Sequence, residues 1–178
     1  MKLAKRLLIA LAVLISIPFL VALALPTTFS VEREITIDQP VDRVFRFISH
    51  LKNQSQYSKW AMLDPGMKQE FRGTDGTKGF VSAWQSDHPE VGTGEQEIVG
   101  LVPDERLDIE IRFQKPFVST DPAYTITESV TDTQTRVRSG YRGKMAYPTN
   151  LMISFVQQKI GEDIAGNLSS LKAVLERK

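Results

Sequence analysis

The side chains that could carry chemistry in this chain are few, and several reactive types are missing. Its 178 residues include no cysteine, which excludes a thiolate nucleophile, an iron–sulfur cluster and a zinc site with cysteine ligands. The two histidines are His50, at the end of a predicted helix, and His88, in a predicted loop. Neither a multi-histidine metal site nor a Ser-His-Asp triad can be assembled from them. We therefore expect no metal, no cofactor and no catalytic residue.

Two local clusters could be read as binding sites, but each is explained more simply as a turn or a polar loop. Glycines at positions 73, 76 and 79 could cradle a phosphate, but no helix beginning with Lys and Ser or Thr follows them. A hairpin turn is therefore favoured. Asp87, His88 and Glu90 could bind a metal ion, yet the segment is a polar loop with no second histidine near it. Neither cluster indicates a binding site.

The charge balance argues against nucleic acid and leaves one basic stripe to explain. With 22 Lys and Arg against 21 Asp and Glu, the chain has no surplus for a phosphate backbone. Four basic residues share one face of a predicted strand and could meet anionic lipid headgroups. Cross-strand ion pairs on the outer face of the sheet are favoured instead. The basic residues are Arg136, Arg138, Arg142 and Lys144, and the acidic ones are Asp108, Glu110 and Glu128.

The N-terminus carries an apolar run long enough to cross a bilayer. Residues 7–25 include no charged side chain and would span about 28 Å as a helix. A cleavable signal peptide, cut after Ala22-Leu23-Ala24, is the alternative, but its apolar core would be shorter. We interpret residues 1–26 as a membrane anchor or signal segment, with the anchor favoured, and residues 27–178 as one domain.

The charges that flank this run predict its orientation. Three basic residues within positions 2–6 precede the run, whereas residues 32–34 that follow it have a net charge of −1. Basic residues are retained on the cytoplasmic side of a membrane. We therefore expect a single-pass protein with a cytoplasmic N-terminus and an extracytoplasmic domain.

The domain begins with the patterns of a strand and a helix. Apolar and polar residues alternate over 31–37, as in a half-buried strand. Asp38 and Pro40 then precede apolar residues at helical spacing over 41–48, which predicts a helix capped by Asp38. A second short helix is expected over 53–60.

From there to about residue 145 the pattern is that of strands joined by tight turns. In the clearest strand, 106–113, the odd-numbered residues after Arg106 are apolar and the even-numbered ones charged. Other strands are expected at 80–85, 95–102, 124–130 and 136–145, with turns at 73–79, 103–105 and 132–134. From residue 149 the spacing is that of a helix of about 27 residues.

These elements predict an α+β fold. A curved antiparallel sheet has an apolar face that must be covered, and the terminal helix is the only predicted element long enough to cover it. This arrangement is a helix-grip fold, in which the sheet wraps around a long C-terminal helix and tends to leave a cavity beside it. Here an N-terminal transmembrane helix precedes the domain.

Short motifs spread over residues 31–176 are similar to those of one superfamily. They are Val31-Glu32-Arg33, Ile37, Pro40, Val44-Phe45, Ile48, Trp60, Asp64-Pro65, Gly76, Gly79, Trp84, Pro103-Asp104-Glu105-Arg106, Thr135-Arg136-Val137, Gly143-Lys144-Met145, Tyr147-Pro148, Ile160-Gly161, Leu168 and Leu171-Lys172. The domain resembles START-like proteins of the SRPBCC (polyketide cyclase/dehydrase-like) superfamily, and the apolar N-terminus is similar to that of a membrane-anchored bacterial subgroup. The domain would then be periplasmic. Because the superfamily shares no catalytic triad or metal site, the resemblance implies a fold and a cavity but no active-site residue. At Ser139 relatives often carry tryptophan, so the cavity would be larger or more hydrated at this point.

We expect the domain to bind a hydrophobic small molecule or lipid between the sheet and the terminal helix. Strand parity, apolar character and the departure at position 139 give the candidate ligand-binding residues. They are Trp84, Ile98, Ile109, Ile111, Phe113, Tyr124, Ser139 and Tyr141. One alternative is a polyketide cyclase/dehydrase-like enzyme that uses Tyr124 or Tyr141 as an acid or base in the same cavity. A second is a protein-interaction or stress-response module, whose sign would be a filled cavity and an exposed apolar patch.

Overall fold

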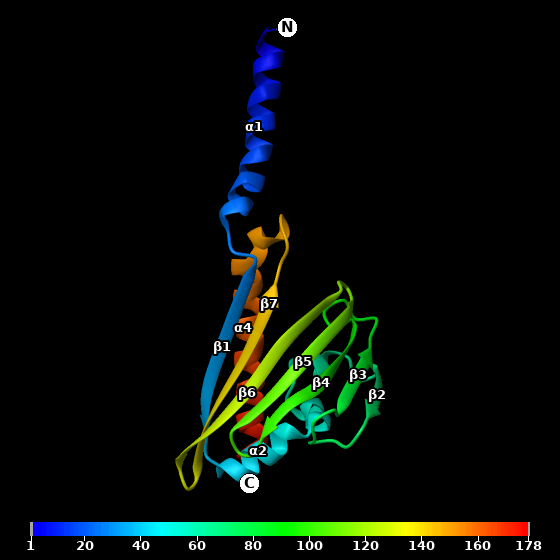
Figure 1. Cartoon of the computed structure of the whole chain (residues 1–178), viewed down its shortest axis with the longest axis vertical. Coiled ribbons are helices and arrows are strands. Elements are labelled where there is room, and N and C mark those ends of the chain that lie inside the picture. The colour runs from blue at the N-terminus through cyan, green and yellow to red at the C-terminus, as the bar shows by residue number, and fades with distance from the viewer. Residues whose placement is uncertain (1, 178) are drawn as a thin grey trace.

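The computed structural model describes residues 2–177 and consists of one long helix followed by an α+β domain (Figure 1). Helix α1 (Lys2–Ala24) projects from the domain, and almost all of its side chains are exposed. The most apolar 18-residue window within Leu3–Ala24 has a mean hydropathy of 2.9, and the segment is long and apolar enough to cross a membrane. Apolar side chains of this kind gain free energy when an apolar surrounding covers them.

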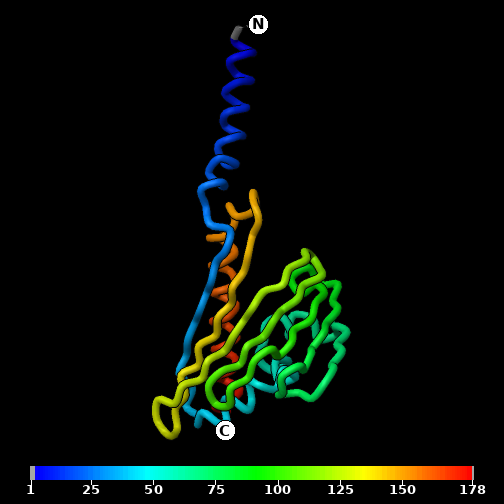
Figure 2. The backbone as a smooth tube through the Cα atoms, in the orientation of Figure 1, coloured from blue at the N-terminus to red at the C-terminus, as the bar shows by residue number. Residues whose placement is uncertain are grey.

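The domain is built on one antiparallel sheet of seven strands in the order β1-β7-β6-β5-β4-β3-β2. All neighbours follow one another in sequence except β1 and β7, which pair from Thr28 opposite Lys144 to Ile37 opposite Thr135. The tube in Figure 2 shows that the sheet curves strongly between its two edge strands, β1 and β2. The strands are β1 (Thr28–Ile37), β2 (Lys68–Arg72), β3 (Val81–Gln85), β4 (Thr93–Val102), β5 (Arg106–Lys115), β6 (Ser119–Thr131) and β7 (Gln134–Lys144).

The terminal helix α4 (Ile153–Leu175) lies along the inner face of the sheet, chiefly over β1 and β7 (Figure 1). Two side chains of α4 bind β1 directly. Gln157 Nε2 donates to the Ser30 carbonyl at 2.7 Å, and Lys172 Nζ donates to the Thr36 carbonyl at 2.6 Å. The predicted helix-grip architecture is therefore confirmed. The first four residues of the predicted helix form a separate 3-10 turn, η2 (Thr149–Met152).

Three short helices between β1 and β2 cover another part of the inner face. They are α2 (Val41–Ser49), η1 (Leu51–Gln56) and α3 (Lys59–Leu63). Helix η1 is joined to β4 by reciprocal amide hydrogen bonds between Gln54 and Gln96, at 2.6 and 3.3 Å. Helix α3 is joined to α4 by Lys59 Nζ, which donates to Asp163 Oδ1 at 2.7 Å. The Asp163 carboxylate raises the pKa of Lys59.

The buried apolar residues form two cores on the same side of the sheet. The first core joins β1, α2, β7 and α4, and its members are Val31, Ile37, Val44, Phe45, Ile48, Val137, Ile164, Leu168, Leu171 and Leu175. The second core lies under η1, and its members are Leu51, Phe80, Ile98, Leu107 and Ile109. The two cores meet at the half-buried Leu101. Between α4 and the second core, inner-face residues such as Ile111, Phe113 and Tyr141 are only half-buried, so this part of the face is not filled by either core.

Asp38 does not cap helix α2, in contrast to the prediction. Pro40 precedes the first turn, and no side chain caps it. The Asp38 backbone N–H instead donates to Glu176 Oε1 at 2.5 Å, and Asp38 Oδ1 accepts from Gln134 Nε2 at 2.7 Å. The bond to Glu176 ties the end of β1 to the end of α4. Asp38 therefore binds partners distant in sequence instead of the first turn of α2.

The outer face of the sheet carries ion pairs, as expected, and one of them joins predicted partners, whereas Asp108 and Glu110 have other partners than those predicted. Arg136 pairs with Glu128 at 3.6 Å across β6 and β7. Asp108 pairs with Arg106 at 2.7 Å, and Glu110 pairs with Arg112 at 2.7 Å, both within β5. Arg112 also binds the Glu95 carboxylate. The hydrogen bond from Arg112, and to a smaller extent the one from Arg72, lowers the pKa of Glu95.

The end of α1 is attached to the domain by one buried side chain. Asn150, which is 1% exposed, donates its Nδ2 to the Ala22 carbonyl at 2.7 Å and to the Leu25 carbonyl at 3.2 Å. The Met145 N–H donates to the Thr27 carbonyl at 2.8 Å beside it. The bond to Ala22 uses one of the backbone carbonyls that the last turn of α1 leaves free, so Asn150 of η2 helps to cap this helix.

Candidate functional site

Aromatic side chains line the half-buried part of the inner face. The Trp84 ring on β3 meets the Phe113 ring on β5 edge to face, with centroids 5.9 Å apart. Between them lies Gly94 of β4, where a Cβ atom would come within 2.8 Å of the Trp84 ring. The missing side chain therefore allows Trp84 to lie across β4 and reach Phe113. The indole N–H donates to the Val91 carbonyl at 3.2 Å, which fixes the ring.

The three predicted isoleucines differ in what they can contact. Ile98 and Ile109 are buried in the second core and face each other across β4 and β5. Both therefore hold the sheet to η1. Ile111 is half-buried, packs against the edge of that core and lies one step closer to Phe113 on the same face. Of the three, Ile111 is the one on the available surface.

A polar group lies on the same face, on β6 and β7. Tyr141 faces Ala123 and Val31, and Ser139 faces Thr125 with their hydroxyl oxygens 3.1 Å apart. Burial raises the pKa of Tyr141, and a hydrogen bond to Asp121 raises it further. Tyr141 is therefore a protonated hydrogen-bond donor across the physiological range.

Asp121 is a candidate site residue that the sequence did not indicate. It is 4% exposed on the inner face of β6, opposite Ile111, and its Oδ2 accepts from Ser119 Oγ at 2.7 Å. An aspartate at the beginning of a strand resembles a turn residue, which is why the pattern did not select it. A buried carboxylate is costly unless it is hydrogen-bonded, so its retention among apolar residues marks it as a candidate polar contact for a ligand.

Tyr124 lies on the outer face, so the prediction that its side chain faces the terminal helix was wrong. It pairs with Asp108 and Gly140, and its hydroxyl donates to Glu32 Oε2 at 2.6 Å. The Arg106 guanidinium lies over the ring, 4.9 Å from the centroid. The inner residues of β6 are small or polar while Tyr124 and Ile126 face outward, so the apolar pattern of this strand is reversed. The hydrogen bond to Glu32 raises the pKa of Tyr124.

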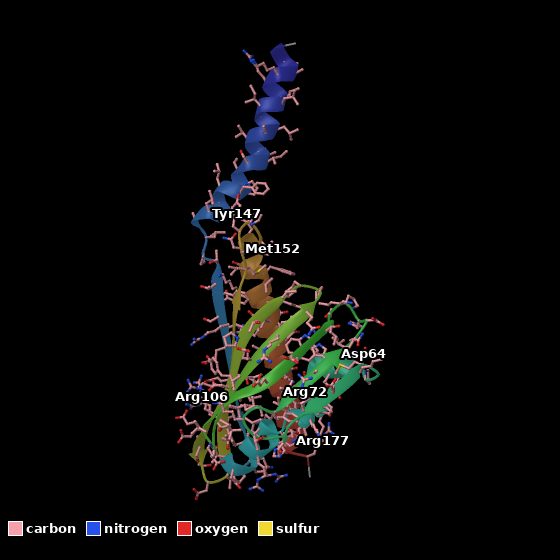
Figure 3. The ribbon with its side chains drawn as sticks, turned by 45° about the vertical axis from the view of Figure 1, so that its right-hand side comes forward. Asp64, Arg72, Arg106, Tyr147, Met152 and Arg177 are labelled. Carbon is pink, nitrogen blue, oxygen red and sulfur yellow. The ribbon has the colours of Figure 1, made fainter. Side chains whose placement is uncertain are left out.

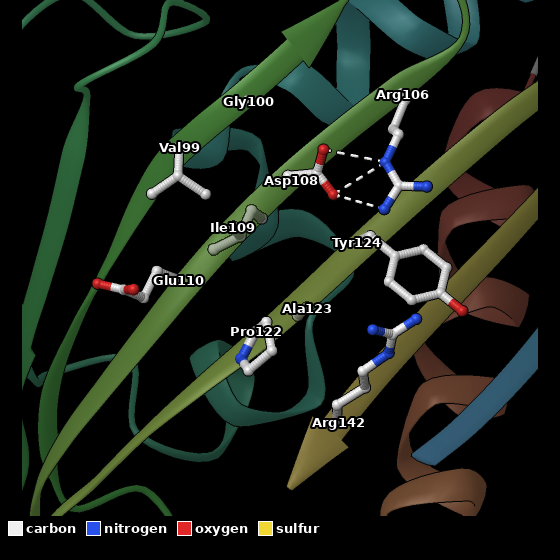
Figure 4. Close-up of a pocket in the computed structure, with 10 residues that line it drawn as sticks. All are labelled: Val99, Gly100, Arg106, Asp108, Ile109, Glu110, Pro122, Ala123, Tyr124 and Arg142. Atoms are coloured by element: carbon white, nitrogen blue, oxygen red, sulfur yellow. Dashed lines mark hydrogen bonds and ion pairs between the residues drawn. The ribbon is translucent and has the colours of Figure 1, made fainter.

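Tyr124 instead borders a hollow of about 370 Å³ on the outer face (Figure 4). Two residues of its polar lining are paired with each other, because Arg106 holds Asp108 through hydrogen bonds of 2.7 and 2.9 Å. A second hollow, of about 190 Å³, lies beside Asp64 and Ser86, which are hydrogen-bonded at 2.5 Å. Among residues 2–177, no three His, Asp or Glu side chains are close enough together to hold a metal ion.

Comparison with known proteins gives one family and a common fold. The family model for polyketide cyclase / dehydrase and lipid transport matches residues 28–176. A search of curated proteins by sequence found no match.

Three solved structures illustrate the shared fold. The Zhui aromatase/cyclase from Streptomyces sp. R1128 is 14% identical, with a TM-score of 0.63 over 84% of this chain and 94% of that one. The protein TTHA0849 from Thermus thermophilus is 18% identical, with a TM-score of 0.59 over 83% and 97%. The Aha1 dimer from Colwellia psychrerythraea is 12% identical, with a TM-score of 0.54 over 81% and 96%. At these identities the likeness shows the fold.

Proposed function

This chain belongs to the polyketide cyclase/dehydrase and lipid transport family, and on that premise we propose that it is a membrane-anchored domain that binds a hydrophobic small molecule or lipid. The ligand lies on the inner face of the sheet, between β3–β7 and α4. The observation that carries this proposal is the half-buried pair of Trp84 and Phe113, which packs into neither core. Apolar surface of this kind gains free energy when a ligand covers it.

The polar group on β6 and β7 supports an amphiphilic ligand rather than a purely apolar one. The protonated Tyr141 hydroxyl and the Asp121 carboxylate offer a donor and an acceptor on a face that is otherwise apolar. Ligand sites commonly combine an apolar wall with a few polar groups that set orientation. The apolar part of the ligand therefore lies against Trp84, Ile111 and Phe113, and its polar part against Tyr141 and Ser139.

We expect that the full chain, purified in detergent, carries a lipid or other hydrophobic compound that native mass spectrometry detects. Trp84→Ser removes half of the aromatic pair and should reduce the bound fraction at least about fivefold. Tyr124→Ser is the matched control, because it truncates a half-buried aromatic residue on the opposite face and should leave the bound mass in place. Equal occupancy in both variants, with unchanged circular dichroism, would contradict the proposal.

The anchor is the second part of the proposal. Helix α1 exposes an apolar surface on every side, and Asn150 holds its end to the domain. We propose that α1 spans the membrane, with its basic end in the cytoplasm and the domain in the periplasm. The full chain should stay in the membrane pellet after extraction at alkaline pH, and protease added to the outside of spheroplasts should digest the domain. A soluble chain that begins near Leu25 would show cleavage instead.

A catalytic role in the same place is the second candidate, and Asp121 is the observation that favours it. A buried carboxylate that raises the pKa of a neighbouring tyrosine is a usable acid–base pair for cyclisation or dehydration of a bound polyketide-like substrate. The two candidates differ in the fate of the ligand. A compound that is released chemically unchanged supports binding, whereas conversion that Asp121→Asn abolishes supports catalysis.

A further inference from the structure

The most exposed large apolar side chains of the domain lie in two segments at one end of it. Among the residues described beyond α1, the four with the largest exposed fractions are Val118 at 87%, Phe155 at 65%, Phe117 at 61% and Met152 at 50%. Phe117 and Val118 belong to the loop between β5 and β6, and Met152 and Phe155 to η2 and the first turn of α4. Exposed apolar residues grouped in this way mark an interaction surface.

The η2 segment lies where the apolar helix ends. Asn150, two residues before Met152, holds the carbonyls of Ala22 and Leu25. Figure 3 shows Tyr147 and Met152 at the base of α1. If α1 spans a bilayer, its last apolar turn lies at the interface, so Met152 and the neighbouring Tyr147 lie at headgroup level. Tyrosine and tryptophan are enriched at that level.

The loop between β5 and β6 lies at the same end of the sheet, on the side away from β1 (Figure 1). Its Phe117 ring is 5.9 Å from the Phe113 ring, which in turn is 5.9 Å from Trp84. A continuous row of three aromatic rings therefore leads from the exposed loop to the inner face. The row connects the proposed site to the end of the domain that carries the membrane helix.

Basic residues accompany both segments. Lys115 ends β5 just before Phe117, and Lys144 ends β7 just before Tyr147, and both side chains are exposed. Among the described residues neither has an ion-pair partner within 4.0 Å. At a membrane surface, lysines can bind the anionic phosphates of the headgroups while neighbouring apolar side chains contact the acyl chains.

We infer that these two segments form a membrane-docking rim, defined by Phe117, Val118, Met152 and Phe155, that inserts into the interfacial layer of the bilayer in which α1 sits. The ligand is then an amphiphile already dissolved in that bilayer, and it enters along the row of rings without crossing water. This inference rests on the proposed function, because it requires both the anchor and the inner-face site. If the rim bound a soluble protein or a second copy of the chain, it would not need to lie at the end of the domain from which α1 projects.

The absence of cysteine allows a direct test with the full chain. Val118→Cys and Phe155→Cys, each labelled with an environment-sensitive fluorophore, are reconstituted into vesicles of equal parts phosphatidylcholine and phosphatidylglycerol. The matched control is Val130→Cys, an exposed valine at the end of β6 that adjoins the β6–β7 turn. Lipids with a quencher on the acyl chain should reduce the emission at positions 118 and 155 at least about threefold and leave position 130 unchanged.

The outcomes separate the rim from the site. No quenching at 118 and 155, or equal quenching at all three positions, overturns the rim. Binding of a fluorescent fatty acid is measured in detergent with the same variants. If they bind the fatty acid but show no quenching, the rim alone fails, and if they do not bind it, the proposed function fails.

A transfer measurement completes the test. The double variant Phe117→Ser, Val118→Ser should slow the uptake of the same fluorescent fatty acid from vesicles at least about tenfold, while its affinity in detergent stays within about twofold. Both side chains are exposed, so the fold does not depend on them. An unchanged uptake rate would overturn the route along the rings.

Discussion

Substitution of Leu168 by alanine should lower the free energy of unfolding by about 2–5 kcal/mol, because the leucine fills the first core. Its side chain is buried on the face of α4 that covers β1 and β7, together with Ile164 and Leu171. The loss combines the transfer of apolar atoms with the cavity that they leave. Urea unfolding of the full chain in mild detergent, followed by the fluorescence of Trp60 and Trp84, measures it.

The adjacent Ser169 gives the control for this prediction. Its side chain is exposed on the other side of α4 and donates within the helix to the Ala165 carbonyl at 2.9 Å. Ser169→Ala should change the free energy of unfolding by less than about 0.5 kcal/mol. A loss below about 1 kcal/mol for Leu168→Ala would mean that α4 does not pack on the sheet as described.

Ser139→Trp should abolish the binding of a fluorescent fatty acid, with at least a tenfold loss of affinity, which corresponds to about 1.4 kcal/mol. Ser139 is half-buried on the inner face, opposite Arg33 and beside Tyr141. An indole there would occupy the space assigned to the ligand. Because a ligand site accepts volume that a packed core resists, the variant should remain folded.

Arg136→Trp is the control for steric bulk on the same strand. Arg136 lies on the outer face of β7, so an indole at this position should leave the fatty acid bound. If Ser139→Trp unfolds the chain, position 139 is part of a packed core and the site is misplaced. If it folds and binds as before, the ligand lies elsewhere.

The sequence predicted the elements well because most of them have a clear apolar period. In β5, Leu107, Ile109 and Phe113 alternate with charged residues, and the pattern gives both the strand and its faces. The long run of apolar positions in α4 likewise gives the helix and the leucines that it buries.

The site was harder to predict because β6 does not follow this rule. Its inner residues Asp121, Ala123 and Thr125 are polar or small, and the outward Tyr124 is covered by Arg106 and held by Glu32. When both faces of a strand are partly covered, apolar and polar residues no longer alternate, and the alternation cannot show which face is the inner one. The backbone carbonyls of Ala22 and Leu25 that Asn150 binds lie more than 120 residues away in sequence, so no local pattern could give them.

The short connection between α1 and β1 sets a limit on where this protein can act. Only residues 25–27 separate Ala24 from Thr28, and a segment of this length reaches about 10 Å even when fully extended. With α1 in a bilayer, the intact chain cannot ferry a compound across an aqueous gap to a second membrane. If the domain passes a bound compound onward, the acceptor must therefore come to the surface of the same membrane.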